Sequence, residues 1–264
     1  MSNEQNVLIV IDPSQNSHPA LARALMMAKQ SKSNEGIKYV FLLTATPEQS
    51  KSSSYFACSD EWIRDQIYDR MADTDIPFSI LVAWSNDWKD VVLEASREHQ
   101  AIMTIVPFYG QAQEHLLSDE KWKLLRNAPN PILIASQLEP RPTRRILCSI
   151  KSQDERYAER NQNVVTTAQQ MADIFGLESH VVNAYTDSME YPDRAQIANT
   201  TSIDNNRIHV KLGEPQDVIC DTAQAIDAAL VLIGSQRRTG LQGVLRGNTV
   251  EKIIERVDSD VLMI

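Results

Sequence analysis

Short runs of apolar residues alternate along the chain with segments whose apolar positions repeat at helical spacing. In the first half the apolar runs cover residues 7–11, 39–43, 78–82, 102–106 and 131–135. Between the first two runs, Leu21, Leu25 and Ala28 recur at the spacing of an amphipathic helix. Because the runs are continuous rather than alternating, we expect strands buried on both faces, as in a parallel sheet covered by helices.

The pattern starts again after a linker at residues 138–143, which contains two prolines and has no periodicity. The apolar runs of the second half cover residues 145–150, 180–185, 208–212, 229–233 and 260–264. This recurrence predicts an internal duplication, with one domain at residues 1–138 and a second at 144–264. Each is expected to be a doubly wound α/β domain, with a five-stranded, mainly parallel sheet flanked by helices.

The segment 234–249 sets the second copy apart, because it holds four of the chain's eight glycines. It follows a predicted buried strand and precedes a predicted helix, which places it at the carboxyl edge of the sheet, where such folds bind ligands. Glycines allow close approach to a ligand, and a helix N-terminus attracts phosphate. Three arginines and no acidic residue give the segment a charge of +3. The alternative is a solvated connection with surface arginines and an ordinary helix cap.

Taken as two repeats with this loop, nearly the whole chain resembles a tandem universal stress protein. That family carries G-x2-G-x9-G-[S/T/N] after its fourth strand, and in its nucleotide-binding members the loop holds the ribose and phosphates of ATP. Gly234, Gly247 and Asn248 match this motif, whereas Arg237 stands where the second glycine would be. Gly-Glu-Pro at residues 213–215 is a further common feature of the family. The resemblance implies ATP or AMP, with Mg²⁺, as the candidate ligand.

The resemblance divides the expected nucleotide site between the two copies. Nucleotide-binding members commonly have an aspartate at the end of the first strand, which the first copy keeps as Asp12 and the second replaces with Lys151. Asp12 is either a ligand group or a cap for the following helix, and Lys151 either a phosphate contact or a solvated lysine; we favour the second role for each. The first copy lacks the glycine loop. The candidate ligand-binding residues are therefore Gly234, Ser235, Arg237, Gly247, Asn248, Thr249 and Lys151.

Composition narrows the class of protein further. A net charge of −9 argues against non-specific binding to nucleic acid. No apolar run has the length of a membrane-spanning helix, and the polar N-terminus does not resemble a signal peptide. Cys58, Cys148 and Cys220 form no CxxC pair and are predicted to be reduced thiols. These features predict a cytoplasmic protein that binds neither nucleic acid nor membranes.

Motifs typical of enzymes are missing: the sequence has no G-x4-G-K-[S/T], no G-x-S-x-G and no H-E-x-x-H. His180 and His209 lie on adjacent predicted strands and can approach one another. Without a carboxylate partner they make a weak metal site, and we predict none. Trp84 and Trp88 follow the third strand of the first copy and either line an apolar pocket or pack between the repeats. We favour packing between the repeats.

The leading hypothesis is a non-enzymatic stress-response protein that binds an adenine nucleotide or another phosphorylated ligand in its second domain. One alternative is a weak ATP hydrolase, for which Glu214 and Asp217 are the nearby acids. The other is a ligand-free scaffold that acts through protein partners. Because the last strand of family members commonly takes part in dimer packing, residues 132–135 and 261–264 are expected to join the repeats as an internal pseudo-dimer. A homodimer of whole chains is a further arrangement.

Overall fold

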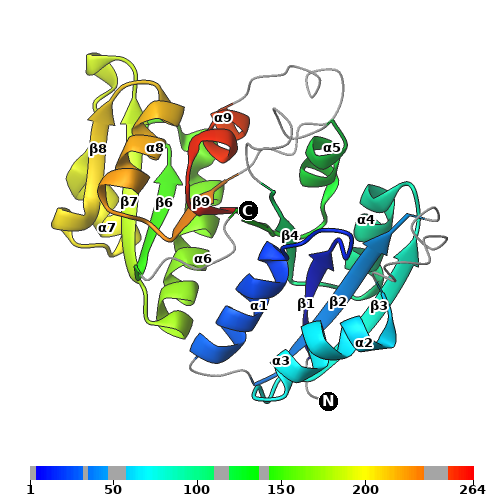
Figure 1. The fold of residues 1–264 in the computed structure, drawn as a ribbon. Helices are drawn as coiled ribbons and strands as arrows, with labels where there is room; N and C mark the ends of the chain where they lie inside the picture. The colour runs from blue at the N-terminus through cyan, green and yellow to red at the C-terminus, as the bar shows by residue number, and fades with distance from the viewer. Residues whose placement is uncertain (1–3, 32–34, 47–57, 110–118, 137–142, 235–248) are drawn as a thin grey trace. The chain divides into compact units, whose positions relative to one another are not determined.

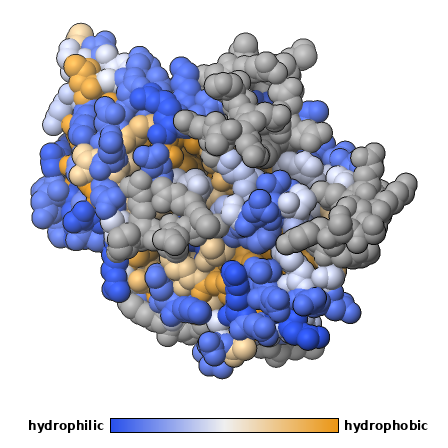
Figure 2. All heavy atoms as spheres, in the orientation of Figure 1, coloured by the Kyte–Doolittle hydropathy of each residue, from blue (hydrophilic) through white to orange (hydrophobic). Residues whose placement is uncertain are grey.

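The computed structural model describes residues 4–31, 35–46, 58–109, 119–136, 143–234 and 249–264. The chain divides into two compact units, Met1–Pro140 (unit 1) and Arg141–Ile264 (unit 2). In each unit parallel strands alternate with helices (Figure 1). Hydrophilic residues cover much of the surface visible in Figure 2, with smaller apolar areas between them. Among the described residues, none of the helices combines the length and the apolar character needed to span a bilayer.

Unit 1 is built on a parallel sheet whose strands have the order β3-β2-β1-β4-β5. Its described elements are β1 (Gln5–Ile11), α1 (Pro19–Gln30), β2 (Ile37–Ala45), α2 (Asp60–Ile63), η2 (Arg64–Tyr68), α3 (Asp69–Met71), β3 (Phe78–Trp84), α4 (Trp88–Glu98), β4 (Met103–Pro107), α5 (Asp119–Asn127) and β5 (Ile132–Ala135). The chain adds strands on one side of β1 and then crosses to the other. The topological switch point therefore lies between β1 and β4, and such points are where open α/β sheets bind ligands.

The core of unit 1 is centred on β1 and β2. Leu8, Ile9 and Phe41 are fully buried, and Ile9 lies opposite Phe41 in the parallel register. Helix α1 packs against β1, β4 and β5 and buries Leu21 and Ala28 at helical spacing, while α4 packs against β1 and β2. Helices therefore shield the apolar side chains of the central strands, which explains why these strands are continuous apolar runs.

Unit 2 repeats this topology with the strand order β10-β9-β6-β7-β8, and all neighbouring strands are parallel. Its described elements are β6 (Arg145–Ile150), η3 (Glu155–Tyr157), α6 (Ala158–Phe175), β7 (Glu178–Tyr185), η4 (Ser188–Glu190), α7 (Arg194–Thr201), η5 (Asn205–Arg207), β8 (Ile208–Leu212), α8 (Pro215–Ala225), β9 (Leu230–Ile233), α9 (Thr249–Arg256) and β10 (Asp260–Met263). The switch point of unit 2 lies between β6 and β9. The predicted fold class, two repeated α/β units with parallel sheets flanked by helices, is confirmed.

Three of the differences from the sequence prediction bear on the sites described below or on what the sequence could predict. Strand β7 begins at Glu178, two residues before the predicted start. The helical segment near Trp62 contains a π-helical turn, η2, between α2 and α3. Helix α7 was not predicted, because only Ile197 and Thr201 of its eight residues are buried and they give little periodic signal. Its first turn is capped by Asp193, whose carboxylate accepts hydrogen bonds from the backbone N–H groups of residues 195 and 196.

Candidate functional site

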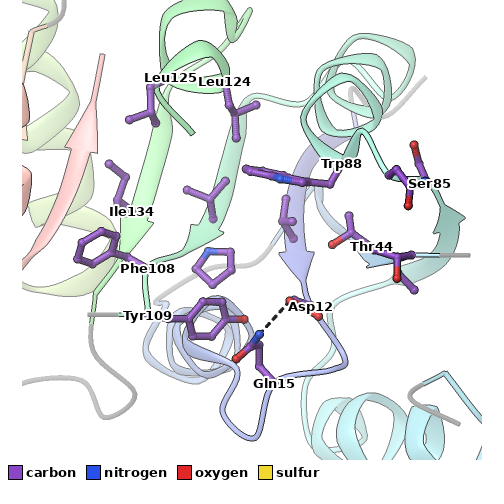
Figure 3. Close-up of a pocket in the computed structure, with 16 residues that line it drawn as sticks. Asp12, Gln15, Thr44, Ser85, Trp88, Phe108, Tyr109, Leu124, Leu125 and Ile134 are labelled. Carbon is purple, nitrogen blue, oxygen red and sulfur yellow. Dashed lines mark hydrogen bonds between the residues drawn. The ribbon is translucent and has the colours of Figure 1, made fainter. Parts of the chain in front are cut away.

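A cavity of about 260 Å³ opens at the carboxyl ends of the strands of unit 1. It lies at the switch point, where Asp12 follows β1 and Phe108 and Tyr109 follow β4 (Figure 3). Side chains from β1, β2, the β3–α4 connection, α4, β4, α5 and β5 contribute to its walls. The fold of unit 1 therefore places a ligand-sized cavity where doubly wound sheets commonly bind small molecules.

The walls of this cavity are mainly apolar. Trp88, the first residue of α4, and Phe108 supply aromatic surface, and Leu124, Leu125 and Ile134 supply aliphatic surface (Figure 3). The Trp88 position depends on Asp87, which caps α4 by accepting a hydrogen bond of 3.3 Å from the backbone N–H of residue 90. The cavity thus offers a flat, apolar surface to a bound ring.

Asp12 is the acidic group of the cavity. Its Oδ1 accepts hydrogen bonds from the backbone N–H of Ser14 at 2.9 Å and from the Ser14 hydroxyl at 2.5 Å. Its Oδ2 accepts a bond of 3.2 Å from Nε2 of Gln15 (Figure 3). The cap position of α1 is occupied by His18 instead. Our favoured interpretation of Asp12 as a cap for this helix was therefore wrong: Asp12 stabilises the turn after β1 and faces the cavity.

Tyr109 brings a buried hydroxyl to the same end of the cavity. The hydroxyl points toward Asp12 and Gln15 in Figure 3, and it meets no hydrogen-bond partner at normal geometry among the described residues. Burial, and then the negative charge of Asp12, raises the pKa of Tyr109. The hydroxyl therefore stays protonated at neutral pH and is available to a ligand as a hydrogen-bond donor.

The two tryptophans after β3 have different roles. Trp88 lines the cavity, whereas Trp84 is 44% exposed. The pocket alternative, which we did not favour, is therefore correct for Trp88. The two alternatives could not be separated from the sequence, because the cavity is assembled from elements that are distant in the chain.

The predicted site residues of unit 2 are only partly described. Ser235, Arg237, Gly247 and Asn248 lie outside the described residues, so their role stays a prediction. Gly234 directly follows β9, Thr249 begins α9, and Lys151 directly follows β6. Since β6 and β9 are neighbouring strands, Lys151 and Gly234 lie at the same carboxyl edge.

Gly234 lies beneath a side chain that the sequence analysis missed. A Cβ atom added to Gly234 would overlap Cγ and Cδ of Arg160, and it would lie 3.3 Å from Cγ2 of Val164. The stem of Arg160, from the start of α6, therefore runs across the end of β9. Arg160 could have been found from the sequence by its position, because it lies near the start of the helix that follows the first strand of the second repeat. That helix begins beside the sheet edge where Lys151 and Gly234 lie.

Two cations gather around Tyr157 at this edge. The Arg160 guanidinium lies 4.7 Å from the centre of the Tyr157 ring, and Lys151 Nζ lies 5.0 Å from it. Lys151 is also 3.9 Å from Oδ2 of Asp154, at the outer limit of an ion pair. Among the described residues, the Arg160 guanidinium has no carboxylate partner. Unit 2 therefore has positive charge beside Gly234, at the carboxyl edge of its sheet. At the equivalent edge of its own sheet, unit 1 has the acidic Asp12.

The backbone of Lys151 is fixed by Asn161. The Asn161 side chain accepts a hydrogen bond of 3.1 Å from the Lys151 N–H and donates one of 2.9 Å to its carbonyl oxygen. Asn183 accepts a bond of 2.8 Å from the N–H of Ser152 and so fixes the next residue. The loop after β6 is thus held in one conformation by side chains of α6 and β7.

His180 and His209 meet as the strand prediction allowed, and a carboxylate joins them. Nδ1 of His180 lies 3.1 Å from Nε2 of His209, and Nε2 of His180 lies 2.7 Å from Oε1 of Glu178. The expectation that the pair has no carboxylate partner was wrong, because β7 starts earlier than predicted and puts Glu178 on the same face as His180. Both nitrogens of His180 are already engaged. Among the described residues, no group of three or more His, Cys, Asp or Glu side chains is arranged so that it could hold a metal ion.

Of the two acids considered for ATP hydrolysis, one has an ion-pair partner and the other caps a helix through its backbone. Asp217 forms an ion pair with Arg256 of α9. Glu214 occupies the cap position of α8, where its backbone carbonyl accepts the first helical hydrogen bonds.

The cysteines are free thiols in the structure. Burial raises the pKa of Cys58 to about 11, with a smaller contribution from Asp12, and raises the pKa of Cys148 to about 12. Both thiols are therefore protonated at neutral pH and are poor nucleophiles.

Comparison with models of known protein families identifies the family of this two-unit chain. The family model described as "Universal stress protein family" matches residues 4–136 and 151–264. Since the two matches cover most of the chain, it belongs to the universal stress protein family, with one family repeat in each unit. The predicted resemblance to a tandem universal stress protein is confirmed.

Relatives and solved structures agree with this assignment. The chain is 26% identical over 300 residues to universal stress protein E of Salmonella typhi, covering 100% of this chain and 95% of the relative. It is 24% identical to universal stress protein E of Escherichia coli K12, with the same coverage. A functionally unknown protein from Pseudomonas aeruginosa PAO1 has a similar structure, with a TM-score of 0.80, 21% identity, and coverage of 100% and 93%. A universal stress protein from Archaeoglobus fulgidus has a TM-score of 0.70, 15% identity, and coverage of 100% and 98%. At these identities the structures show the fold alone.

Proposed function

We propose that this chain is a non-enzymatic stress-response protein that binds an adenine nucleotide, or another phosphorylated ligand, in unit 2. The observation that carries the proposal is the position of Arg160. Its guanidinium stacks on Tyr157 beside Gly234 and has no carboxylate partner among the described residues. An arginine that stacks on a ring and has no carboxylate partner within the described part of the chain, close to the start of an arginine-rich segment, suits recognition of a phosphate.

The local sequence strengthens this proposal. The segment that follows Gly234 carries Arg237, Arg238 and Arg246 and no acidic residue, in a chain of net charge −9. Thr249, directly after this segment, begins α9, and a helix N-terminus favours anions. Lys151 adds a second cation at the same edge. We propose that Gly234, Lys151 and Thr249, with Ser235, Arg237, Gly247 and Asn248, contribute to this site, together with Arg160. Mg²⁺ would accompany ATP as part of the ligand.

A non-enzymatic role is the simpler proposal because Asp217, one of the two acids of the hydrolase hypothesis, is paired with Arg256. The cytoplasmic location, the boundaries 1–138 and 144–264, the internal pseudo-dimer through the last strands and a homodimer stay predictions from the sequence.

Thermal unfolding in the presence of nucleotides tests the proposal. The protein is melted with increasing ATP, ADP or AMP, each with and without Mg²⁺. A melting temperature that rises with nucleotide concentration is expected, because a ligand that binds the folded state stabilises it. The rise should be reduced in Gly247→Val and in Arg160→Gln.

Arg156→Gln is the matched control. Arg156 is one turn earlier, is 86% exposed and is bonded to Asp154, so its loss removes one positive charge without removing the stacked guanidinium. A shift that stays unchanged in Arg160→Gln, or no shift with any nucleotide, would contradict the proposal. The latter outcome would favour the scaffold alternative, in which the chain acts through protein partners.

A further inference from the structure

Strand β3 is the outer strand of the unit 1 sheet, and its free side lacks the usual protection of such a strand. Among the described residues it pairs with β2 alone, so its other side faces away from the sheet (Figure 1). Its seven residues include no charged residue and no proline. Proteins commonly protect such an edge with lysine, proline, a bulge or a covering element, because a free edge can pair with another chain.

The backbone groups on the free side follow from the pairing of β3 with β2. At one end of the pair, the N–H of Tyr39 donates to the carbonyl oxygen of Pro77 at 3.0 Å. At the other end, the N–H of Ser85 donates to the carbonyl oxygen of Ala45 at 2.9 Å. With the parallel register between them, these bonds direct the backbone groups of the odd-numbered residues toward β2. The residues whose N–H and C=O groups point away from β2 are Phe78, Ile80, Val82 and Trp84.

The outer strand of unit 2 is protected where β3 is not. By the same alternation, the carbonyl group of Ile208 in β8 points away from β7, and Nη2 of Arg194 donates a hydrogen bond of 2.8 Å to it. Arg194 begins α7, which packs against β8. Strand β8 is also shorter than β3 and contains Lys211. The unprotected edge is therefore a feature of unit 1 and not of the repeat as such.

Apolar side chains accompany the free edge of β3. Val82 and Trp84 are 42% and 44% exposed, and they share one face of the strand because they are two residues apart. Tyr68 of η2 is 54% exposed and meets Phe78 edge to face, with 5.2 Å between the ring centres. A strand paired with β3 would cover part of this apolar surface, which adds hydrophobic burial to the backbone hydrogen bonds.

Acidic side chains lie at both ends of β3. Asp73 and Asp75 precede the strand, are exposed, and form no ion pair within the described part of the chain. Asp87 and Asp90 follow the strand and share Lys89, whose Nζ lies 3.5 Å and 3.3 Å from their carboxylate oxygens. Residues 72–77 and residues 85–90 therefore both carry a net negative charge.

This charge pattern argues against a second copy of the chain as the partner of β3. Antiparallel pairing of two β3 strands aligns all their outward groups when Leu81 of each copy lies at the centre. That register brings Asp75 of one copy toward Asp87 of the other, and like charges that face each other destabilise a strand pair. A segment with basic residues at both ends would meet opposite charge in either strand direction.

We propose that the free edge of β3 is a docking site for an extended segment of another protein, which joins the sheet of unit 1 as a further strand. The segment has apolar residues at alternate positions and carries lysine or arginine at both ends. Its backbone and apolar residues supply the affinity, and its basic ends supply the selectivity. The site uses none of the residues that line the cavity and none of those proposed to bind nucleotide.

Residue-resolved amide hydrogen exchange tests this pairing directly. The probe is a synthetic peptide of alternating valine and threonine, as long as β3, with two lysines at each end and blocked termini. In the chain alone, the amides of Ile80 and Val82 should exchange fast and those of Ser79 and Leu81 slowly, because only the latter two face β2. Saturating peptide should slow the exchange of Ile80 and Val82 at least about tenfold and leave β8 unchanged.

Val82→Pro tests the backbone contribution. It removes one outward N–H without a change of charge, and proline is tolerated in an edge strand where the N–H faces solvent. The affinity for the peptide, measured by fluorescence anisotropy, should fall at least about tenfold. Val82→Thr keeps the N–H and the branched side chain, so it is the matched control and should bind within about twofold of the parent chain. Circular dichroism shows that both variants are folded.

Charge variants test the contribution of the acidic ends. Asp73→Asn combined with Asp75→Asn should weaken peptide binding severalfold. Glu94→Gln combined with Glu98→Gln removes two exposed acids of α4 instead and should leave the affinity unchanged. The same peptide with glutamate in place of each lysine should bind at least about tenfold more weakly to the parent chain.

Three outcomes with the peptide would overturn the proposal. They are no binding of the lysine peptide up to roughly 1 mM, binding that survives Val82→Pro, and equal binding of the glutamate peptide. Sedimentation of the chain alone tests the other occupant, because a dimer that Val82→Pro dissociates would show that β3 pairs with a second copy instead. None of these measurements includes a nucleotide, so failure of this proposal is distinct from failure of the nucleotide proposal.

Discussion

At the scale of single residues, neighbours within each unit decide what a side chain can do. Lys151 and Asp12 follow equivalent strands, yet Lys151 lies beside Tyr157 and Asp154, whereas Asp12 faces an apolar cavity. Gly234 is required by Arg160, whose stem fills the space that a Cβ would need. These partners come from other elements, which is why the sequence alone did not reveal them.

Gly234→Ala is expected to destabilise unit 2. Its methyl group overlaps the Arg160 stem, and forcing extra volume into a packed position typically costs about 1–3 kcal/mol. Urea denaturation of the single variant, of Arg160→Ala and of the double variant measures the coupling. The cost of Gly234→Ala should fall to well under half when Arg160 is shortened. Equal costs in both backgrounds would show that Arg160 is not the obstacle.

The histidine pair predicts a pH dependence of stability. Burial, followed by the nearby charges of His180, Lys211 and Arg194, lowers the pKa of His209 to about 4. Arg145 of β6 and Arg207 of η5 also face Glu178 in this cluster. The unfolded chain takes up a proton on His209 near pH 6.5, whereas the folded chain does not until about pH 4. The free energy of unfolding contributed by neutral His209 is therefore present above pH 6.5 and is lost as the pH falls toward 4.

His209→Gln should remove this part of the pH dependence. Between pH 7 and pH 4 the variant is expected to lose less stability than the parent chain, by roughly 1–2 kcal/mol after allowance for solvent screening at a half-buried edge. Urea denaturation at several pH values measures the difference. His99→Gln, at the end of α4, is the control. Parallel curves for the parent chain and His209→Gln would contradict the assignment.

At the scale of elements, continuous apolar runs predicted the strands well because helices shield the sheet in both units. Element starts were less predictable where polar residues begin a strand: the exposed Glu178 carries no apolar signal, although it pairs in register with Arg145. Helix α7 was not predicted for a related reason, since its stability depends on the Asp193 cap and on few buried side chains. The spacing of apolar residues indicates which side chains are buried. It does not reveal an element that is stabilised mainly by hydrogen bonds.

Strand β10 offers the sharpest test at this scale. Leu262 is 1% exposed in β10, so Leu262→Asp would bury a charge without a partner and should lower the free energy of unfolding by about 3–5 kcal/mol. Leu212→Asp makes the same substitution in β8 at a side chain that is 59% exposed, and it should cost less than about 1 kcal/mol. Similar melting temperatures for the two variants would mean that β10 is not a core strand.

At the scale of the whole molecule, the duplication could be predicted but the division of chemistry between the units could not. The glycine-rich loop of unit 2 is a local motif, and a local motif is visible in a sequence. The cavity of unit 1 has no such motif, because Trp88, Tyr109, Leu124 and Ile134 come together only when the sheet forms. The same edge of the fold nevertheless carries different side chains in the two units: Asp12 beside an apolar cavity in unit 1, and Lys151 and Arg160 in unit 2.

The contact between Gly234 and Arg160 bears on how such sequences are compared with one another. A glycine at the end of the fourth strand is commonly counted as a marker of ligand binding, yet here its own unit requires it, whether or not a ligand is present. Packing of this kind couples two positions in evolution. Relatives that keep a long side chain at the start of the first helix should keep the glycine. In relatives with a short side chain there, the glycine can be replaced without a clash. The glycine is informative about nucleotide binding only when it is read together with residue 160.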